Sequence, residues 1–180
     1  LVREENKTPY IVSIPFPGRT VKAQIWKISV GRISLYLLDT NITANSRHDR
    51  LITNQLYGGE REMRICQEIV LGIGGLRALS VLGLEPTVCH MNEGHAAFMA
   101  LERVQSLQSR FNMSFDEAVE ATRSSNIFTV HTPVAAGNDE FDIELVDKYF
   151  SHYYPKLGID KKRFMSLGQT GRGDEKEKFK

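Results

Sequence analysis

The sequence predicts an α/β fold with a mixed sheet, on two observations. Residues 10–38 contain three segments in which apolar and polar residues alternate, so we expect an antiparallel β-meander there. Two later apolar runs, 86–89 and 126–130, have the length of buried strands, and helical patterns lie between them and after them. A strand, a helix and a second strand in this order form a βαβ unit with parallel strands.

Turn residues divide the first part of the chain into its strands. Pro17-Gly18-Arg19 supplies one turn and Val30-Gly31-Arg32 the next. Residues 39–59 then read as a loop with one helical turn near 51–56, and a loop of this length inside a compact domain is often functional. The three meander strands are expected at 10–14, 20–26 and 32–38.

A helix is predicted over 60–82, because its apolar residues recur at three- and four-residue steps. Gly72, Gly74 and Gly75 interrupt it, and each glycine costs a helix roughly 1 kcal/mol relative to alanine. Close approach of the helix backbone to another element or to a ligand would compensate. A phosphate-binding loop is the alternative, but it requires glycines between a strand and a helix.

Further helices are expected after the first of the two apolar runs. Asn92 and Glu93 suit the N-cap and first turn of a helix over 94–110. Ser114 with Glu117 three residues later forms a capping box for the next helix. A short apolar-faced helix over 141–150 follows a polar loop.

Composition narrows the class of protein. The 180 residues, with 41% apolar and 25% charged side chains, fit one soluble domain or most of one. A net charge of +1 favours no acidic partner, and the basic stretch 161–180 is interpreted as solvated surface, so no nucleic-acid partner is expected. No run of roughly 18 apolar residues predicts a membrane span.

The chain begins without Met and without an apolar signal segment, so we expect a piece of a longer cytoplasmic protein. Cys66 and Cys89 sit in apolar surroundings without the spacing of a metal or redox motif. Buried free thiols in a reducing compartment are therefore expected.

Two polar clusters predict a ligand site. The segment from His90 to His95 follows the run at 86–89, and His131 follows the run at 126–130. Open α/β folds bind ligands at the carboxyl ends of their strands, and a nearby helix N-terminus suits a polyhydroxyl or phosphorylated ligand. A metal held by these histidines with Glu93 or Asp139 is the alternative, but the five-residue step between His90 and His95 is not the spacing of one helix face, and no metal is predicted.

Several motifs together resemble the alpha-glucan phosphorylase family, and the resemblance covers nearly the whole chain in order. It rests on Leu35-Tyr36-Leu37-Leu38-Asp39-Thr40-Asn41, Leu56-Tyr57-Gly58-Gly59, Arg64-Ile65-Cys66-Gln67-Glu68, Asn92-Glu93-Gly94-His95 and His131-Thr132-Pro133-Val134.

This resemblance implies a glycosyltransferase of the GT-B arrangement, in which two Rossmann-like domains face each other across a cleft. Residues 1–180 would then be part of the N-terminal, glucan-binding domain, divided into the meander 1–40, the loop 41–59 and the α/β units 60–180. The reaction implied is phosphorolysis of an α-1,4-glucan by inorganic phosphate, giving α-D-glucose 1-phosphate. Pyridoxal 5'-phosphate would be held by a Lys of a C-terminal domain that this chain lacks, so the chain alone should be inactive.

The resemblance also assigns roles to residues, with His131 bonding the glucose. Asn92, Glu93 and His95 would line the cleft near the cofactor, as further catalytic residues. The substrate-binding candidates are Tyr57, Gly58, Gly59, Glu60, Arg64, Thr132, Asn138 and Asp139.

Two other functions remain open from the sequence. One is a GT-B glycosyltransferase that uses a nucleotide sugar, and the other is a carbohydrate-binding module without catalysis. The oligomeric state stays open as well.

Overall fold

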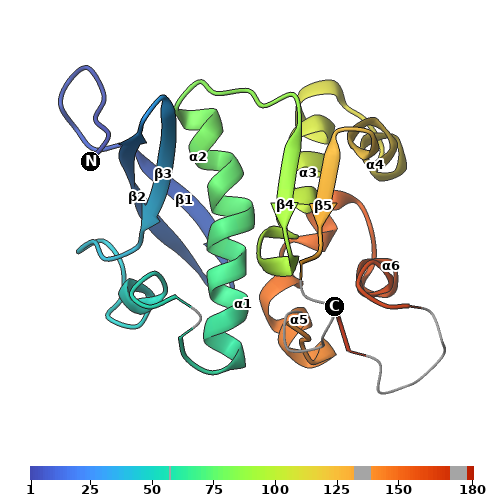
Figure 1. The fold of residues 1–180 in the computed structure, drawn as a ribbon. Coiled ribbons are helices and arrows are strands. Elements are labelled where there is room, and N and C mark those ends of the chain that lie inside the picture. The colour runs from blue at the N-terminus through green and yellow to red at the C-terminus, as the bar shows by residue number, and fades with distance from the viewer. Residues whose placement is uncertain (57, 132–138, 171–177) are drawn as a thin grey trace. The chain divides into compact units, whose positions relative to one another are not determined.

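The structure is a computed structural model that describes residues 1–56, 58–131, 139–170 and 178–180. The chain forms two compact units, Leu1–Pro86 and Thr87–Lys180. The α/β class is confirmed, because both units combine helices with strands (Figure 1). That all 180 residues belong to one N-terminal domain stays a prediction.

The first unit begins with the predicted meander. Strands β1 (Ile11–Phe16), β2 (Arg19–Val30) and β3 (Ile33–Asp39) form an antiparallel sheet in the order β1-β2-β3. Gly18 and Gly31 stand at the two turns with φ of +65° and +59°, a region that glycine enters without a steric cost. The expected turns are therefore confirmed, and β2 extends four residues past its predicted end at Trp26.

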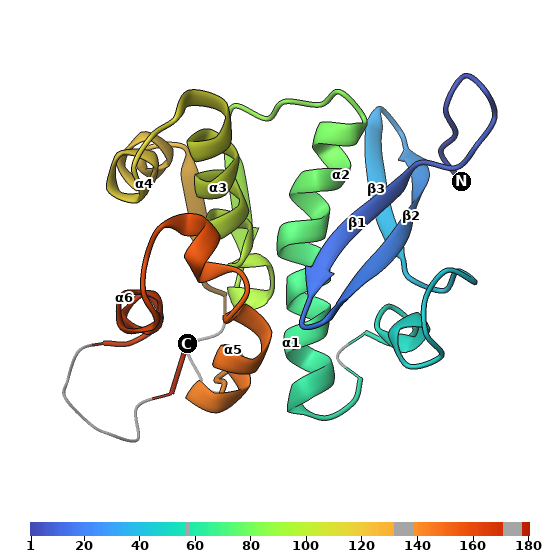
Figure 2. The same ribbon diagram turned by 180° about the vertical axis from the view of Figure 1, so that it is seen from behind.

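One long helical segment packs on this sheet. It consists of α1 (Arg61–Ile69), a π-helical turn (Val70–Gly74) and α2 (Gly75–Val81), and it runs along one face of the three strands (Figures 1 and 2). A Cβ built on Gly74 would lie 2.6 Å from Ile14 Cδ1 and 3.3 Å from Leu38 Cδ1. The glycine thus permits close packing, as predicted, and the phosphate-loop alternative fails because the glycines lie inside a helix.

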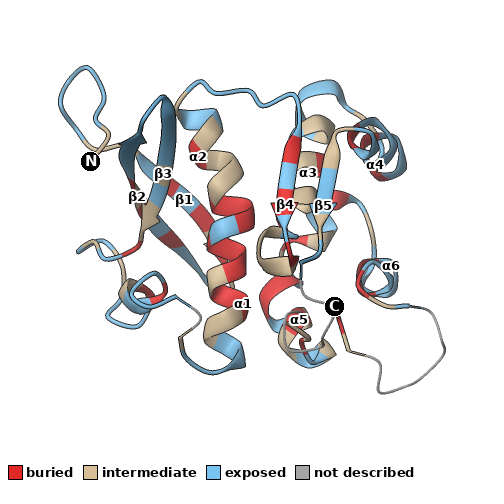
Figure 3. Ribbon diagram, in the orientation of Figure 1, coloured by how far each residue is buried: buried red, intermediate tan, exposed pale blue. Residues whose placement is uncertain are grey.

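The two faces of the meander differ in burial. Alternate residues of β1 and β2 facing the helix are buried, and they supply the core of this unit (Figure 3). The cross-strand pairs Trp26–Leu37, Ile28–Leu35 and Val30–Ile33 stand on the opposite face and are exposed. The core of the first unit is therefore one-sided. The buried strand residues are Val12, Ile14, Phe16, Val21, Ala23 and Ile25.

The loop after β3 is attached to the sheet by a buried ion pair. Asp49, 3% exposed, accepts hydrogen bonds from Arg19 Nε at 3.1 Å and Arg19 Nη2 at 2.8 Å, and from Ser46 Oγ at 2.7 Å. Asn45 Nδ2 donates to the Lys22 carbonyl at 2.6 Å. Asp49 opens the 3-10 turn Asp49–Leu51, so the helical turn expected near 51–56 is found slightly earlier.

We expect acid to weaken this attachment. Burial raises the pKa of Asp49, but the hydrogen bonds from Arg19 and Ser46 and the charge of Arg19 outweigh burial and lower the pKa overall. A lowered pKa stabilises the fold above the unfolded value of about 3.9, and this contribution disappears as pH falls through the folded value.

Asp49→Ala should therefore lower the free energy of unfolding by about 1–3 kcal/mol at pH 7, because it leaves the partly buried Arg19 without its acceptor. The difference from wild type should shrink below about pH 4. Urea denaturation at pH 7 and pH 3 measures it. Asp116→Ala, which removes an 80% exposed carboxylate paired with Arg163, is the control and should change little. An Asp49 effect that persists undiminished at pH 3 would contradict this account.

The second unit contains the predicted βαβ pattern. Strands β4 (Cys89–Asn92) and β5 (Asn126–Thr129) form a parallel pair, joined through α3 (Met99–Phe111) and α4 (Phe115–Arg123). The Ser114–Glu117 capping box at the start of α4 is confirmed. The remaining helices are α5 (Ile143–Phe150) and α6 (Lys161–Ser166), with 3-10 turns at Gly94–Ala96 and Tyr154–Leu157.

The prediction of a single mixed sheet is wrong for the part of the chain that the structure describes. The strands form two sheets, one of three antiparallel strands and one of two parallel strands. The reason is that β3 and β4 share no backbone ladder, so the antiparallel and parallel parts never join. Among the described helices, none has the length and apolar character to cross a bilayer.

An aromatic cluster forms the core of the second unit. Phe150 is its centre, with ring centroids 4.6 Å from Phe98, 6.0 Å from Tyr153 and 5.2 Å from Phe164. The Tyr153 hydroxyl donates to the buried Glu102 carboxylate at 2.7 Å, which satisfies both polar groups. This core fixes α3, α5 and α6 around the strand pair.

Both cysteines are free and buried, as predicted. Cys66 lies on α1, and Cys89 is the first residue of β4. Each thiol belongs to a core and is inert in this setting.

Candidate functional site

The strand β4 begins and ends three residues later than the predicted run at 86–89. His90 therefore lies on the strand and not after it, which corrects the sequence interpretation. The alternation along β4 explains the shift, because Cys89 and Met91 are buried while His90 and Asn92 are exposed. His90 Nε2 lies 2.5 Å from Thr129 Oγ1 on the neighbouring strand. His90 thus ties β4 to β5.

Glu93 follows β4 directly and stands at the N-cap position, although Asn92 was predicted there and Glu93 in the first turn. It precedes the 3-10 turn Gly94–Ala96 without a side-chain capping bond. Its carboxylate is 6% exposed, and Oε1 accepts a 2.6 Å hydrogen bond from the backbone N–H of His131. The prediction of Asn92 as the N-cap and Glu93 in the first turn was wrong, because Asn92 is still paired with Thr129 in the strands and the Glu93 carboxylate accepts a distant N–H.

Three of the predicted site residues lie at the carboxyl edge of the β4–β5 pair. Asn92 is paired in register with Thr129, and Glu93 accepts from the His131 N–H, so the three residues lie where both strands end. The Asn92 and His131 residues are exposed, whereas Glu93 is buried. This strand edge therefore carries two exposed polar residues, one with an amide and one with an imidazole, and one buried carboxylate.

The run before His131 is not buried, contrary to expectation. Ile127 and Phe128 are 48% and 49% exposed, and Val130 is 56% exposed. The apolar content of β5 correctly indicated a strand, but the strand is largely exposed and not buried as predicted.

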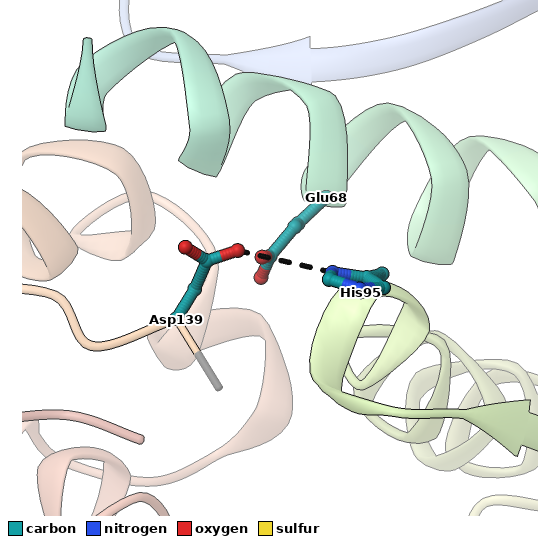
Figure 4. Close-up of side chains that lie close together, drawn as sticks. All are labelled: Glu68, His95 and Asp139. Atoms are coloured by element: carbon teal, nitrogen blue, oxygen red, sulfur yellow. Dashed lines mark ion pairs between the residues drawn. The ribbon is translucent and has the colours of Figure 1, made fainter. Parts of the chain in front are cut away.

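His95 and Asp139 form a second contact in this unit. His95 Nδ1 lies 3.8 Å from Asp139 Oδ2, and the side chains are 24% and 34% exposed (Figure 4). The pair joins the 3-10 turn after β4 to the segment that precedes α5. Of the ligands considered for a metal, His95 and Asp139 lie close together, whereas His90 Nε2 contacts Thr129 Oγ1 and Glu93 Oε1 accepts from the His131 backbone N–H.

The candidates of the first unit stand at the start of α1. Gly59, with φ of +88°, leads into Glu60, which is the N-cap residue of the helix. Arg64 Nη1 donates to Gln67 Oε1 at 2.9 Å, and Arg64 Nη2 lies 3.8 Å from Glu68 Oε1. The Arg64 side chain is only 13% exposed, so it belongs to a network on the helix.

Gln67 is a residue of this network that the predicted site omitted. Its Nε2 donates to the Gln55 carbonyl at 3.0 Å and lies 3.4 Å from the Gly58 carbonyl. It therefore anchors the loop that contains the predicted substrate-binding residues. Tyr57, Thr132 and Asn138 lie outside the described residues.

Comparisons with known proteins give the chain its family. No protein-family model matches the chain. A maltodextrin phosphorylase of Thermococcus litoralis is 43% identical over 171 residues, which cover 95% of this chain and 20% of that protein. A glycogen phosphorylase of Mycobacterium tuberculosis is 44% identical over 193 residues (99% of this chain, 22% of that protein), and one of Aquifex aeolicus is 33% identical over 155 residues (86% and 22%).

These three relatives are named as phosphorylases of maltodextrin or glycogen, and the chain is therefore similar to this class of protein. The chain spans about a fifth of the length of these relatives. It corresponds to a segment of the glycogen and maltodextrin phosphorylase family.

Proposed function

We propose that the protein containing this chain catalyses phosphorolysis of α-1,4-glucans and releases α-D-glucose 1-phosphate. The chain would supply part of the glucan site in the N-terminal domain of a GT-B enzyme. The observation that carries the proposal is the match of almost the entire chain, at 43–44% identity, to proteins named maltodextrin phosphorylase and glycogen phosphorylase.

The strand-end geometry supports the same function. Asn92, an exposed amide, and His131, an exposed imidazole, stand at the carboxyl edge of a parallel strand pair. Parallel α/β folds bind ligands at this edge. Both side chains can donate hydrogen bonds to sugar hydroxyls. This unit could therefore hold and orient a terminal glucose.

The cofactor expected of this family is pyridoxal 5'-phosphate, and it would supply a phosphate group to the reaction. A lysine that forms a Schiff base usually lies in an apolar pocket. The lysines that the structure describes are surface groups: Lys161 pairs with Asp147 at 2.8 Å and Lys180 with Glu140 at 3.1 Å. The described residues do not fit the cofactor site, and we derive no step through it.

The residues present can contribute to glycosyl transfer by orientation and charge. Cleavage of a glycosidic bond develops positive charge on the sugar ring. His131 would hold a glucose hydroxyl, and the carboxylate of Asp139 would favour positive charge nearby. The free, buried thiols of Cys66 and Cys89 agree with a cytoplasmic location for the enzyme.

An activity assay of the full-length protein tests the proposal. Maltoheptaose and inorganic phosphate should yield α-D-glucose 1-phosphate, and no product should form when sulfate replaces phosphate. Transfer of glucose from a nucleotide sugar to the same acceptor, without phosphorolysis, would identify a glycosyltransferase that uses a nucleotide sugar. Binding of maltoheptaose with neither activity would identify a carbohydrate-binding module.

A further inference from the structure

We infer that Glu93 is a positioning residue that fixes the backbone of His131, and does not itself contact the sugar. The inference deepens the proposed function, and its kinetic consequence rests on that function. The structural part of the inference concerns only the ends of β4 and β5, which belong to one unit, and it does not depend on the proposed function.

Glu93 is bonded to the end of β5 in two ways. Its backbone N–H donates to the Thr129 carbonyl at 2.9 Å, and its Oε1 accepts from the His131 N–H at 2.6 Å. The ladder of paired residues between β4 and β5 ends at Asn92 and Thr129. The Glu93 side chain thus extends the connection between the strands by two residues, to the position where the exposed imidazole begins.

The backbone of Glu93 is held in a conformation that suits glycine. Its φ is +58° and its ψ is −170°, a region that side chains with a Cβ rarely enter. Such a conformation persists only where surrounding contacts determine it. Here the two hydrogen bonds and the burial of the side chain provide those contacts.

A glycine would relieve the backbone strain but would remove the carboxylate. Glycine occurs one position later, at Gly94, where a Cβ would meet nothing within 4 Å. The residue with the carboxylate acceptor, Glu93, therefore stands at the position with the strained backbone. The unstrained neighbouring position, where a Cβ would fit, is occupied by Gly94. This placement fits a carboxylate needed for its hydrogen bond.

Fixing the His131 N–H restricts the direction of its side chain. The imidazole is exposed, so core packing does not hold it. His90 reinforces the same strand end by bonding Thr129 Oγ1. A ligand would then meet an imidazole that is oriented before binding, which lowers the cost of ordering it.

Substitutions in the full-length protein separate positioning from chemistry. Glu93→Ala removes the acceptor, whereas Glu93→Gln keeps an amide oxygen at the same reach. Glu93→Gly also removes the acceptor but relieves the strain, so it remains informative if Glu93→Ala misfolds. Glu120→Ala, on the solvent-exposed side of α4, is the matched control.

The first measurement is amide hydrogen exchange at His131, which requires no activity. Exchange should accelerate roughly tenfold or more in Glu93→Ala and in Glu93→Gly, because that amide loses its acceptor. Glu93→Gln should restore most of the protection, and Glu120→Ala should match wild type. Unchanged protection in both Glu93→Ala and Glu93→Gly would overturn the inference. This measurement decides the structural link even if the wild-type protein shows no phosphorolysis, a result that would refute the proposed function alone.

The second measurement is phosphorolysis of maltoheptaose by the same variants. Glu93→Ala should lower kcat roughly tenfold with a much smaller change in KM, since it disorders a group needed in the transition state. Glu93→Gln should recover most of that loss and keep the wild-type pH profile of kcat. If Glu93→Gln is as slow as Glu93→Ala, Glu93 acts through its charge or its proton, and the positioning role is overturned.

Discussion

Replacing His131 with alanine in the full-length protein should lower the turnover number for phosphorolysis of maltoheptaose at least about tenfold. The exposed imidazole follows β5 at the strand edge, and its backbone N–H is fixed by the buried Glu93. An orienting hydrogen bond at a reacting sugar contributes about 1.4 kcal/mol or more to transition-state stabilisation, which corresponds to that factor. Steady-state rates of α-D-glucose 1-phosphate formation measure it.

His48→Ala is the matched control for this prediction. His48 is an exposed histidine in the loop of the first unit, with a side chain 64% accessible, and it belongs to no candidate site. Its substitution should leave turnover unchanged. Wild-type turnover in the His131→Ala variant would remove His131 from the site and would leave the strand-end interpretation without its main residue.

Gly74→Val should destabilise the first unit by about 1–3 kcal/mol, the usual cost of overpacking a filled core. A Cβ at Gly74 would already lie 2.6 Å from Ile14 Cδ1 and 3.2 Å from Ile14 Cγ1. Ile14 is fully buried on β1, so it has little room to move away. The free energy of unfolding in urea, followed by circular dichroism, measures the effect.

Gly75→Val provides a control one residue away on the same helix. A Cβ at Gly75 would meet nothing within 4 Å. Valine also favours a helix slightly over glycine, so stability should stay within about 0.5 kcal/mol of wild type or rise. Equal destabilisation by both substitutions would mean that the close contact between Gly74 and Ile14 does not explain the effect of Gly74→Val.

Local patterns predicted most of the secondary structure. The alternation in the meander, the two glycine turns and the Ser114–Glu117 capping box depend on residues close together in the sequence. The packing role of the glycine-containing helix could also be inferred, because three glycines in a helix require a compensating contact. Each of these features appears in the structure near its predicted position.

The sequence could place the candidate residues along the strands, but it could not give the contacts among them. The sequence indicated that His90–His95 and His131 belong to one edge, and the register of β4 with β5 agrees. It misplaced His90, and it put Glu93 in the first turn of a helix with Asn92 as the N-cap. Short strands lack a strong boundary signal, and a carboxylate that can cap a helix can equally accept a distant N–H.

The sequence by itself determined the family of the chain, its α/β class and the residue types at the strand ends, since these follow from motifs and local periodicity. Only the tertiary structure decided that the strands form two sheets, that His90 bonds Thr129, and that Glu93 holds His131. The physical reason is that a hydrogen bond selects its partner by distance and burial in the folded chain. Residues 93 and 131 become neighbours only after the parallel pair has formed.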